Sequence, residues 1–89
     1  MPRMSRSQLS KFANENGLHV FKCDNKIASL GFIPYNLVLQ IKWPRKEGHK
    51  TGINIFSSDH KQKLLVDSID DALTNIRAVV MEYKLTRGR

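Results

Sequence analysis

The side chains of this 89-residue chain that could perform acid–base or metal chemistry are three histidines, one cysteine and eight carboxylates. A metal site needs Cys, His or carboxylate ligands that converge at recognisable spacings. Here His19, His49 and His60 belong to separate segments, and Cys23 has no Cys-x-x-Cys partner. We therefore expect no metal, no cofactor and no enzymatic activity. His49 and His60 stand in basic segments and could act as general acid and base on RNA, which keeps a small ribonuclease as an alternative.

The basic side chains form the stronger pattern. Lys and Arg number 15 against eight acids, which gives a formal net charge of +7. Such a charge on a small domain raises the local concentration of polyanions. Basic clusters bind phosphates without reading bases, so we predict a non-catalytic nucleic-acid-binding domain, with RNA favoured over DNA. The candidate nucleic-acid-binding residues are Lys11, Lys42, Arg45, Lys46, His49, Lys50, His60, Lys61 and Lys63.

A predicted β-hairpin over residues 36–57 positions most of these basic residues. Apolar side chains alternate along both of its arms, which is the period of half-buried strands. Pro44 and Gly48 punctuate the connection, so a basic tip should project into solvent. Phe56 is the better candidate for stacking on a single-stranded base, because Trp43 falls on the core face. The face opposite the core should show Val38, Gln40, Lys42, Asn54 and Phe56.

A helix is predicted at each end of the chain. Ser7 can cap a helix over residues 8–16, which Gly17 ends. Ser68 can cap a long helix over residues 69–85, because a hydroxyl at the N-cap and a carboxylate three residues later form a variant of the capping box. Each helix carries one apolar stripe, so both helices can cover a single face of a sheet.

The strands complete an α+β prediction. Residues 18–23 and 27–33 are interpreted as strands, with Gly31 as a candidate bulge, and residues 63–66 as a short edge strand or a loop. Successive strands with short connections form antiparallel sheet. The sequence therefore predicts a two-layer sandwich in which a sheet of three to four antiparallel strands carries an N-terminal and a long C-terminal helix on one face.

The domain organisation and location follow from length and composition. Residues 7–85 are long enough for one domain, with a basic flexible arm over 1–6 and a basic tail over 86–89. One cysteine excludes an intramolecular disulfide and is typical of a reducing cytoplasm. The basic N-terminus is not followed by the apolar segment of a signal peptide, and the longest apolar stretch is too interrupted to span a bilayer.

The order of elements resembles the double-stranded-RNA-binding domain. The pattern L-x-x-F-A-x-x-x-G-L over residues 9–18 is similar to the opening helix of that family and the glycine that follows it. The hairpin and the basic run over residues 60–63 are similar to its central hairpin and its phosphate-binding lysines. The resemblance implies RNA contacts by Ser10, Lys11 and Asn14.

The same resemblance assigns phosphate contacts to Lys61 and Lys63. The chain departs from the family pattern in two places. The family's loop between its first two strands carries a Gly-Pro-x-His motif, whereas this chain has only Gly31 and Pro34 in that region. The family places lysines in the first turn of its last helix, whereas Asp70 and Asp71 open the predicted helix here.

An alternative function is a protein-binding inhibitor or antitoxin-like module. Residues 67–73 resemble the helix opening of small HicB-type antitoxin domains, and the composition resembles phage-encoded, RNA-dependent inhibitors of host ribonuclease toxins or defence enzymes. Three consecutive apolar residues, Leu64, Leu65 and Val66, fit neither a helical nor an alternating pattern. With a free sheet edge beside them, we predict that they form a protein interface together with the outer edge of the 69–85 helix, where Val79 and Met81 widen the apolar stripe. The interface would serve either a homodimer or another protein.

Overall fold

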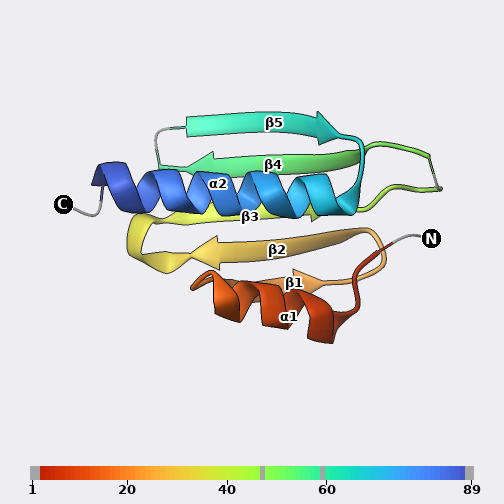
Figure 1. Ribbon diagram of the computed structural model, residues 1–89, viewed down its shortest axis with the longest axis horizontal. Coiled ribbons are helices and arrows are strands. Elements are labelled where there is room, and N and C mark those ends of the chain that lie inside the picture. Colours follow the sequence, from red (N-terminus) through yellow and green to blue (C-terminus); the bar gives the residue numbers. More distant parts are fainter. Residues whose placement is uncertain (1–2, 47, 59, 88–89) are drawn as a thin grey trace.

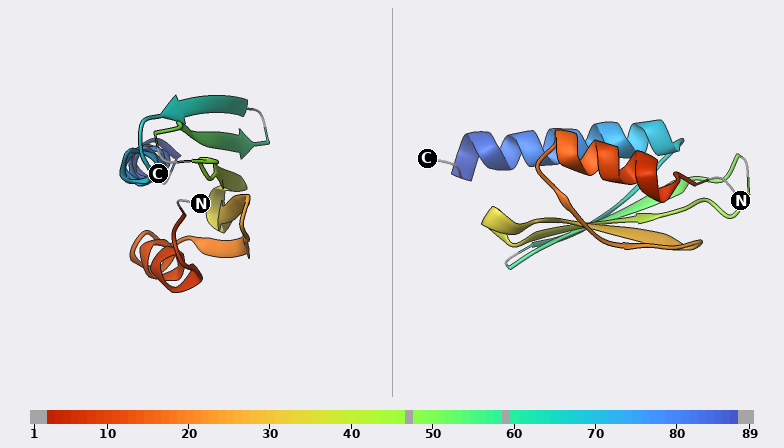
Figure 2. Two further views of the ribbon diagram at one scale, coloured as in Figure 1. Left: turned by 90° about the vertical axis from the view of Figure 1, so that its right-hand side faces the viewer. Right: turned by 90° about the horizontal axis from the view of Figure 1, so that it is seen from below.

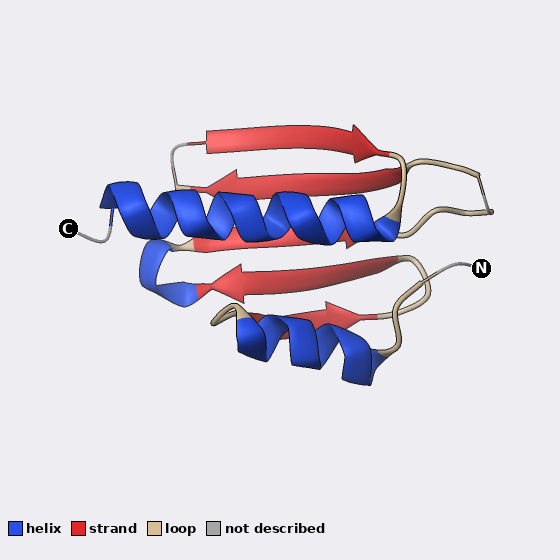
Figure 3. Cartoon of the chain, viewed as in Figure 1, coloured by secondary structure: helices blue, strands red, loops and turns tan. Residues whose placement is uncertain are grey.

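The computed structural model describes residues 3–46, 48–58 and 60–87, except for the side chains of His60 and Arg87. The helices are α1 (Arg6–Glu15) and α2 (Ile69–Arg87), and the strands are β1 (His19–Cys23), β2 (Ile27–Phe32), β3 (Leu37–Lys42), β4 (Thr51–Ser57) and β5 (His60–Val66). A short 3₁₀ turn, Ile33–Tyr35, joins β2 to β3. The strands pair in chain order, each antiparallel to the next, in one five-stranded sheet (Figures 1 and 3).

Both helices lie on the same face of the sheet, with α1 against β1 and α2 along β4 and β5 (Figure 2). The expected α+β fold with a helix at each end of the chain is therefore confirmed. Neither helix covers the opposite face, which we call the open face. No helix in the described part of the chain has the length and apolar character needed to cross a membrane.

The core fills the space between the sheet and the two helices. Alternate strand residues point inward, as the period of two requires, and meet one stripe from each helix. The buried apolar residues of the helices are Leu9, Phe12, Ala13, Ala72, Ile76 and Val80, and those of the strands are Ala28, Leu30, Phe32, Leu37, Leu39, Ile41, Ile53 and Ile55. Trp43 is also buried, as expected, and its indole Nε1 donates to the carbonyl oxygen of Asp24 at 3.0 Å. This bond ties the end of β3 to the β1–β2 turn.

The predicted number of strands was too low, because β5 is a full strand of seven residues. Its first half shows no alternation in the sequence, since Lys61, Gln62 and Lys63 are all polar. The register nevertheless pairs every residue of β5 with β4, from Ser57 opposite His60 to Thr51 opposite Val66. At the edge of a sheet, polar residues are tolerated on both sides of a strand, so the pattern alone did not reveal this one.

The helix starts and the bulge also refine the sequence prediction. The N-cap of α1 is Ser5 rather than Ser7, because Ser5 and Gln8 form a complete capping box. Ser68 caps α2 as expected, and its Oγ accepts from the backbone N–H of Asp71 at 3.1 Å. The bulge is not at Gly31 but on the neighbouring strand, where the register of β1 shifts between Val20 and Lys22.

Candidate nucleic-acid interface

The open face is organised in three rows that run across the strands, because paired residues on neighbouring strands point to the same side. The first row consists of His19, Gly31, Val38, Phe56 and Lys61. The second row, which we call the polar row, consists of Lys22, Ser29, Gln40, Asn54 and Lys63. The third row consists of Ile27, Lys42, Gly52 and Leu65. The outward placement expected for Val38, Gln40, Lys42, Asn54 and Phe56 is therefore confirmed.

The charge on the open face has one sign. The five strands contain four lysines and no aspartate or glutamate. These lysines are Lys22, Lys42, Lys61 and Lys63, and all four are exposed. Carboxylates of the described chain lie instead in the helices, just before α2 and in the β1–β2 turn, where Asp24 Oδ2 lies 3.4 Å from Lys22 Nζ. A surface lined by one sign of charge focuses potential and attracts the opposite charge, so the open face favours a polyanion.

The polar row adds hydrogen-bonding groups between its terminal lysines. Gln40 Nε2 donates to Ser29 Oγ at 3.4 Å on the neighbouring strand, and Asn54 follows on β4. Lys22 and Lys63 end this row on β1 and β5, four strand spacings apart, which corresponds to roughly 19 Å. Lysines at both ends with amide and hydroxyl groups between them suit a chain of phosphates and sugars that crosses the strands.

An aromatic ring that the sequence analysis did not identify lies over the first row, at Gly31. Phe21 is the extra residue of the β1 bulge, and its ring lies over Gly31, where a Cβ atom would collide with ring atoms Cε2 and Cζ. Bulges change the direction of a side chain and interrupt strand alternation. Phe21 and Lys22 therefore both belong to the open face, and no period in the sequence could have placed them there. Phe21 is 56% exposed.

The second aromatic residue of this row is Phe56 on β4. It is half-buried, and Lys61 from the paired position on β5 holds its Nζ 5.9 Å from the ring centroid. A cation over an aromatic ring is attracted by the electrons of the ring face. This contact keeps a positive charge beside the ring, where a phosphate would lie if a base approached Phe56.

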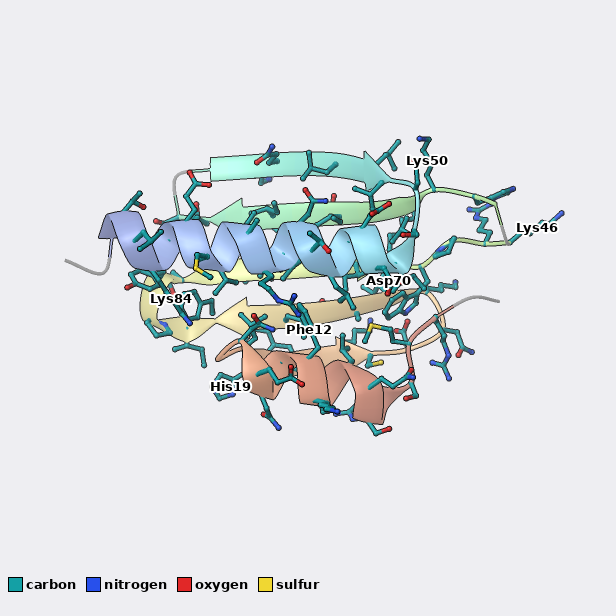
Figure 4. All side chains as sticks on the ribbon, viewed as in Figure 1. Phe12, His19, Lys46, Lys50, Asp70 and Lys84 are labelled. Carbon is teal, nitrogen blue, oxygen red and sulfur yellow. The ribbon has the colours of Figure 1, made fainter. Side chains whose placement is uncertain are left out.

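The basic β3–β4 loop lies at one end of the molecule (Figure 4). Arg45, Lys46, His49 and Lys50 are exposed, and Lys42 connects this loop with the open face. Because the second arm of the predicted hairpin joins the loop to the 60–63 run, the sequence predicts that these two basic clusters can converge, but β4 separates them. The loop precedes Thr51, whereas His60 pairs with Ser57 at the other end of the strand. Lys61 is thus about five strand residues, or roughly 17 Å, from the loop.

Lys50 has a carboxylate partner among the described residues. Its Nζ lies 2.8 Å from Asp67 Oδ1, just before α2. The hydrogen bond from Lys50, followed by its charge, lowers the pKa of Asp67, and the same pair raises the pKa of Lys50. Asp67 and Asp70 also line the depression beside Lys46 and His49, which disfavours an anion inside it.

Other sequence candidates lie away from the open face. Lys11 is exposed on α1, in the helix layer, where Ser10 and Asn14 line the same shallow depression. The side chain of His60 lies outside the described residues. His49 is exposed in the loop. Within the described ranges, no three His, Cys, Asp or Glu residues gather as a metal site would require.

The apolar triplet of β5 alternates, contrary to the sequence interpretation. Leu64 and Val66 are half-buried and pack against the core, whereas Leu65 points to the open face and is 71% exposed. The three residues therefore do not form one continuous surface. A separate apolar strip lies on the outer side of α2. Met81 and Leu85 are 54% and 65% exposed there, and Ala78 lines the same shallow depression.

Comparisons of the chain with protein-family models, with curated proteins and with solved structures gave no match.

Proposed function

We propose that this chain is a small non-catalytic nucleic-acid-binding domain that holds its ligand on the open face of the sheet. One observation carries the proposal: a five-stranded sheet leaves one face free of helices, and its strands bear four lysines and no carboxylate. Contacts between lysines and phosphates supply affinity without reading bases. We therefore expect binding that depends on the phosphate backbone more than on sequence.

We favour RNA over DNA because of the groups between the lysines. Gln40 and Asn54 offer amide groups along the polar row, whereas Ser29 is buried and holds Gln40. The ribose 2′-hydroxyl both donates and accepts a hydrogen bond, and it is the group by which proteins distinguish RNA from DNA. Comparing RNA and DNA oligonucleotides of one sequence tests this preference directly.

The main test removes charge from the open face. Lys61→Gln combined with Lys63→Gln should weaken binding to all sequences alike, and the slope of log K against log salt should become shallower by roughly 0.7 per lysine on a single strand. Fluorescence anisotropy with labelled oligonucleotides between about 50 and 200 mM salt measures both quantities.

Lys11→Gln is the control for each lysine removed, because it removes one positive charge from the helix layer. We expect it to change the salt slope much less than the open-face double variant. Equal effects of the two variants would place binding elsewhere, and an affinity that does not depend on salt would contradict the proposal.

A second candidate function is protein binding, as in an inhibitor or antitoxin, and the apolar strip of α2 favours it. Exposed Met81 and Leu85 on one helix suit association with a second copy of the chain. Sedimentation equilibrium of the protein and of its Met81→Asp and Leu65→Asp variants tests this. A dimer lost only in Met81→Asp would locate the interface on α2, loss only in Leu65→Asp would locate it at β5, and a monomer at every concentration would contradict self-association.

A further inference from the structure

We propose that the open face selects single-stranded over double-stranded nucleic acid, by stacking unpaired bases on Phe21 and Phe56. The inference rests on the proposed function, which concerns phosphate contacts alone, and adds the form of the ligand. It depends on how the two rings are presented on the face and on what surrounds them.

Phe21 is held in place by the local backbone. The β1 bulge turns its side chain outward, and the absence of a Cβ atom at Gly31 leaves room for the ring against the sheet. With 56% of its surface exposed, Phe21 presents a large apolar area to solvent near the β1 edge of a basic face. Aromatic rings fixed on a sheet surface are the platforms on which unstacked bases lie in single-strand-binding proteins.

Phe56 lies in the same row as the ring of Phe21. The cross-strand pairs connect Gly31 with Val38 and Val38 with Phe56, so two strand spacings, roughly 10 Å, separate the two platforms. Val38 is the only row residue between them and offers a low apolar surface. With one base stacked on each ring, the sugar-phosphate backbone of the nucleic acid could run along the first row between them.

The surroundings of the rings match the remaining parts of a nucleotide. Lys61 Nζ lies over the ring of Phe56, so a base that stacks on that face displaces the lysine toward the ring edge, and Lys22 follows Phe21 in the chain. A lysine is thus available beside each ring. The polar row lies next to both and brings Gln40 and Asn54 within the reach of base edges and sugars. Each nucleotide would therefore meet the same three groups: a ring for its base, a lysine for its phosphate and an amide of the polar row.

A duplex cannot use these features. Its bases are stacked inside the helix, and its outer surface offers phosphates and sugars to a protein. A duplex would therefore contact the lysines and leave both rings unused. A single strand gains the stacking contacts in addition, and stacking tolerates any base because every base has a flat aromatic face.

The experiment compares a single-stranded oligonucleotide with its own duplex, using the full chain and anisotropy at one salt concentration. We expect tighter binding of the single strand, and a loss of about 5- to 100-fold in single-strand affinity for Phe21→Leu and for Phe56→Leu. Leucine keeps an apolar cover over the sheet and removes the ring, so a role limited to covering Gly31 would survive these changes. Phe21→Tyr and Phe56→Tyr keep a ring and should retain binding.

Ile33→Ala is the matched control, because Ile33 is as exposed as Phe21 and lies in the β2–β3 turn, outside the three rows. Phe21→Trp gives a second readout: emission of the new indole should be quenched by a single strand and not by a duplex, while Trp43 stays buried. Equal affinity for both forms with no effect of the leucine variants would overturn this inference and leave lysine-dependent binding intact. Absence of binding to either form at low salt would overturn the proposed function itself.

Discussion

The two faces of the sheet are made by the same strands and differ in almost every property. On the helix side, Leu39 and Ile53 are completely or almost completely buried. On the open side, their immediate neighbours Gln40 and Asn54 remain accessible and belong to a row that ends in lysines. A period of two allows a strand to stabilise the fold with one face and leave the other for binding.

The distribution of charge strengthens this comparison. Carboxylates occur at sites where they stabilise local structure, such as Asp70 and Asp71 in the first turn of α2, where the helix dipole favours anions. Asp24 Oδ1 accepts backbone hydrogen bonds from Lys26 and Ile27 in the β1–β2 turn. Acids thus serve the helices and turns, while the strands carry lysines alone, and of these Lys22 lies 3.4 Å from the Asp24 carboxylate.

The largest difference between the two faces should appear in stability. Leu39→Ala removes a completely buried side chain from the helix side, and we expect a loss of about 2–5 kcal/mol in the free energy of unfolding, since a cavity remains. Gln40→Ala, one residue later on the open side, should change it by less than about 0.5 kcal/mol. Urea unfolding followed by circular dichroism measures both. Comparable losses would mean that the open face is part of the structural core.

A smaller effect is expected where the open face itself requires a special backbone residue. Gly31→Ala introduces a Cβ atom that collides with the ring of Phe21, and overpacking of this kind costs about 1–3 kcal/mol. Because Phe21 is exposed, the ring can also move away, and then single-strand binding should fall while stability changes little. Gly31→Ala combined with Phe21→Ala should recover stability and not binding. Unchanged stability and binding in Gly31→Ala would contradict the packing of Phe21 on Gly31.

The contrast between the buried and the open face also explains which side-chain positions the sequence could predict. Alternation in β3 and β4 placed Val38, Gln40 and Phe56 on the open side, because paired strands with one buried face obey a strict period. Phe21 was not identified, because both faces of the 18–23 segment carry apolar residues and the sequence left its inward face open. The first half of β5 was missed, because an edge strand needs no apolar alternation. Side-chain placement was therefore predictable only where burial controls it.

Pairing between distant residues could not be predicted either. The contact of Lys50 with Asp67 depends on the β4–β5 register, which sets Thr51 opposite Val66 and so places the residues just outside both strands side by side. No local pattern around Lys50 indicates it. Among the loop cations, the sequence could count positive charges and could not show which of them already has a partner.

The smallest effect is expected at this pair. Lys50→Gln should weaken nucleic-acid binding less than Lys46→Gln, because the charge of Lys50 is partly satisfied by Asp67 at 2.8 Å. Asp67→Asn should free Lys50 and strengthen binding slightly at low salt. Anisotropy with the same labelled oligonucleotides ranks these variants. A larger loss for Lys50→Gln than for Lys46→Gln would show that the ligand displaces Asp67 from the lysine.

The pH dependence of stability separates the pair from the open face. Because the folded pKa of Asp67 lies below its ordinary value of 3.8, the pair stabilises the fold above that pH, and the contribution is lost as pH falls through the lowered pKa. Because the folded pKa of Lys50 lies above 10.5, the contribution is also lost as pH rises through the raised pKa.

The melting temperatures of the protein and of Asp67→Asn should therefore differ by a small, constant amount between about pH 5 and about pH 9, and converge in acid. Both side chains are more than half exposed, so salt should shrink the difference. Lys63→Gln should show no such acid convergence, because no carboxylate of the described chain pairs with Lys63. A similar convergence there would mean that Lys63 has a carboxylate partner.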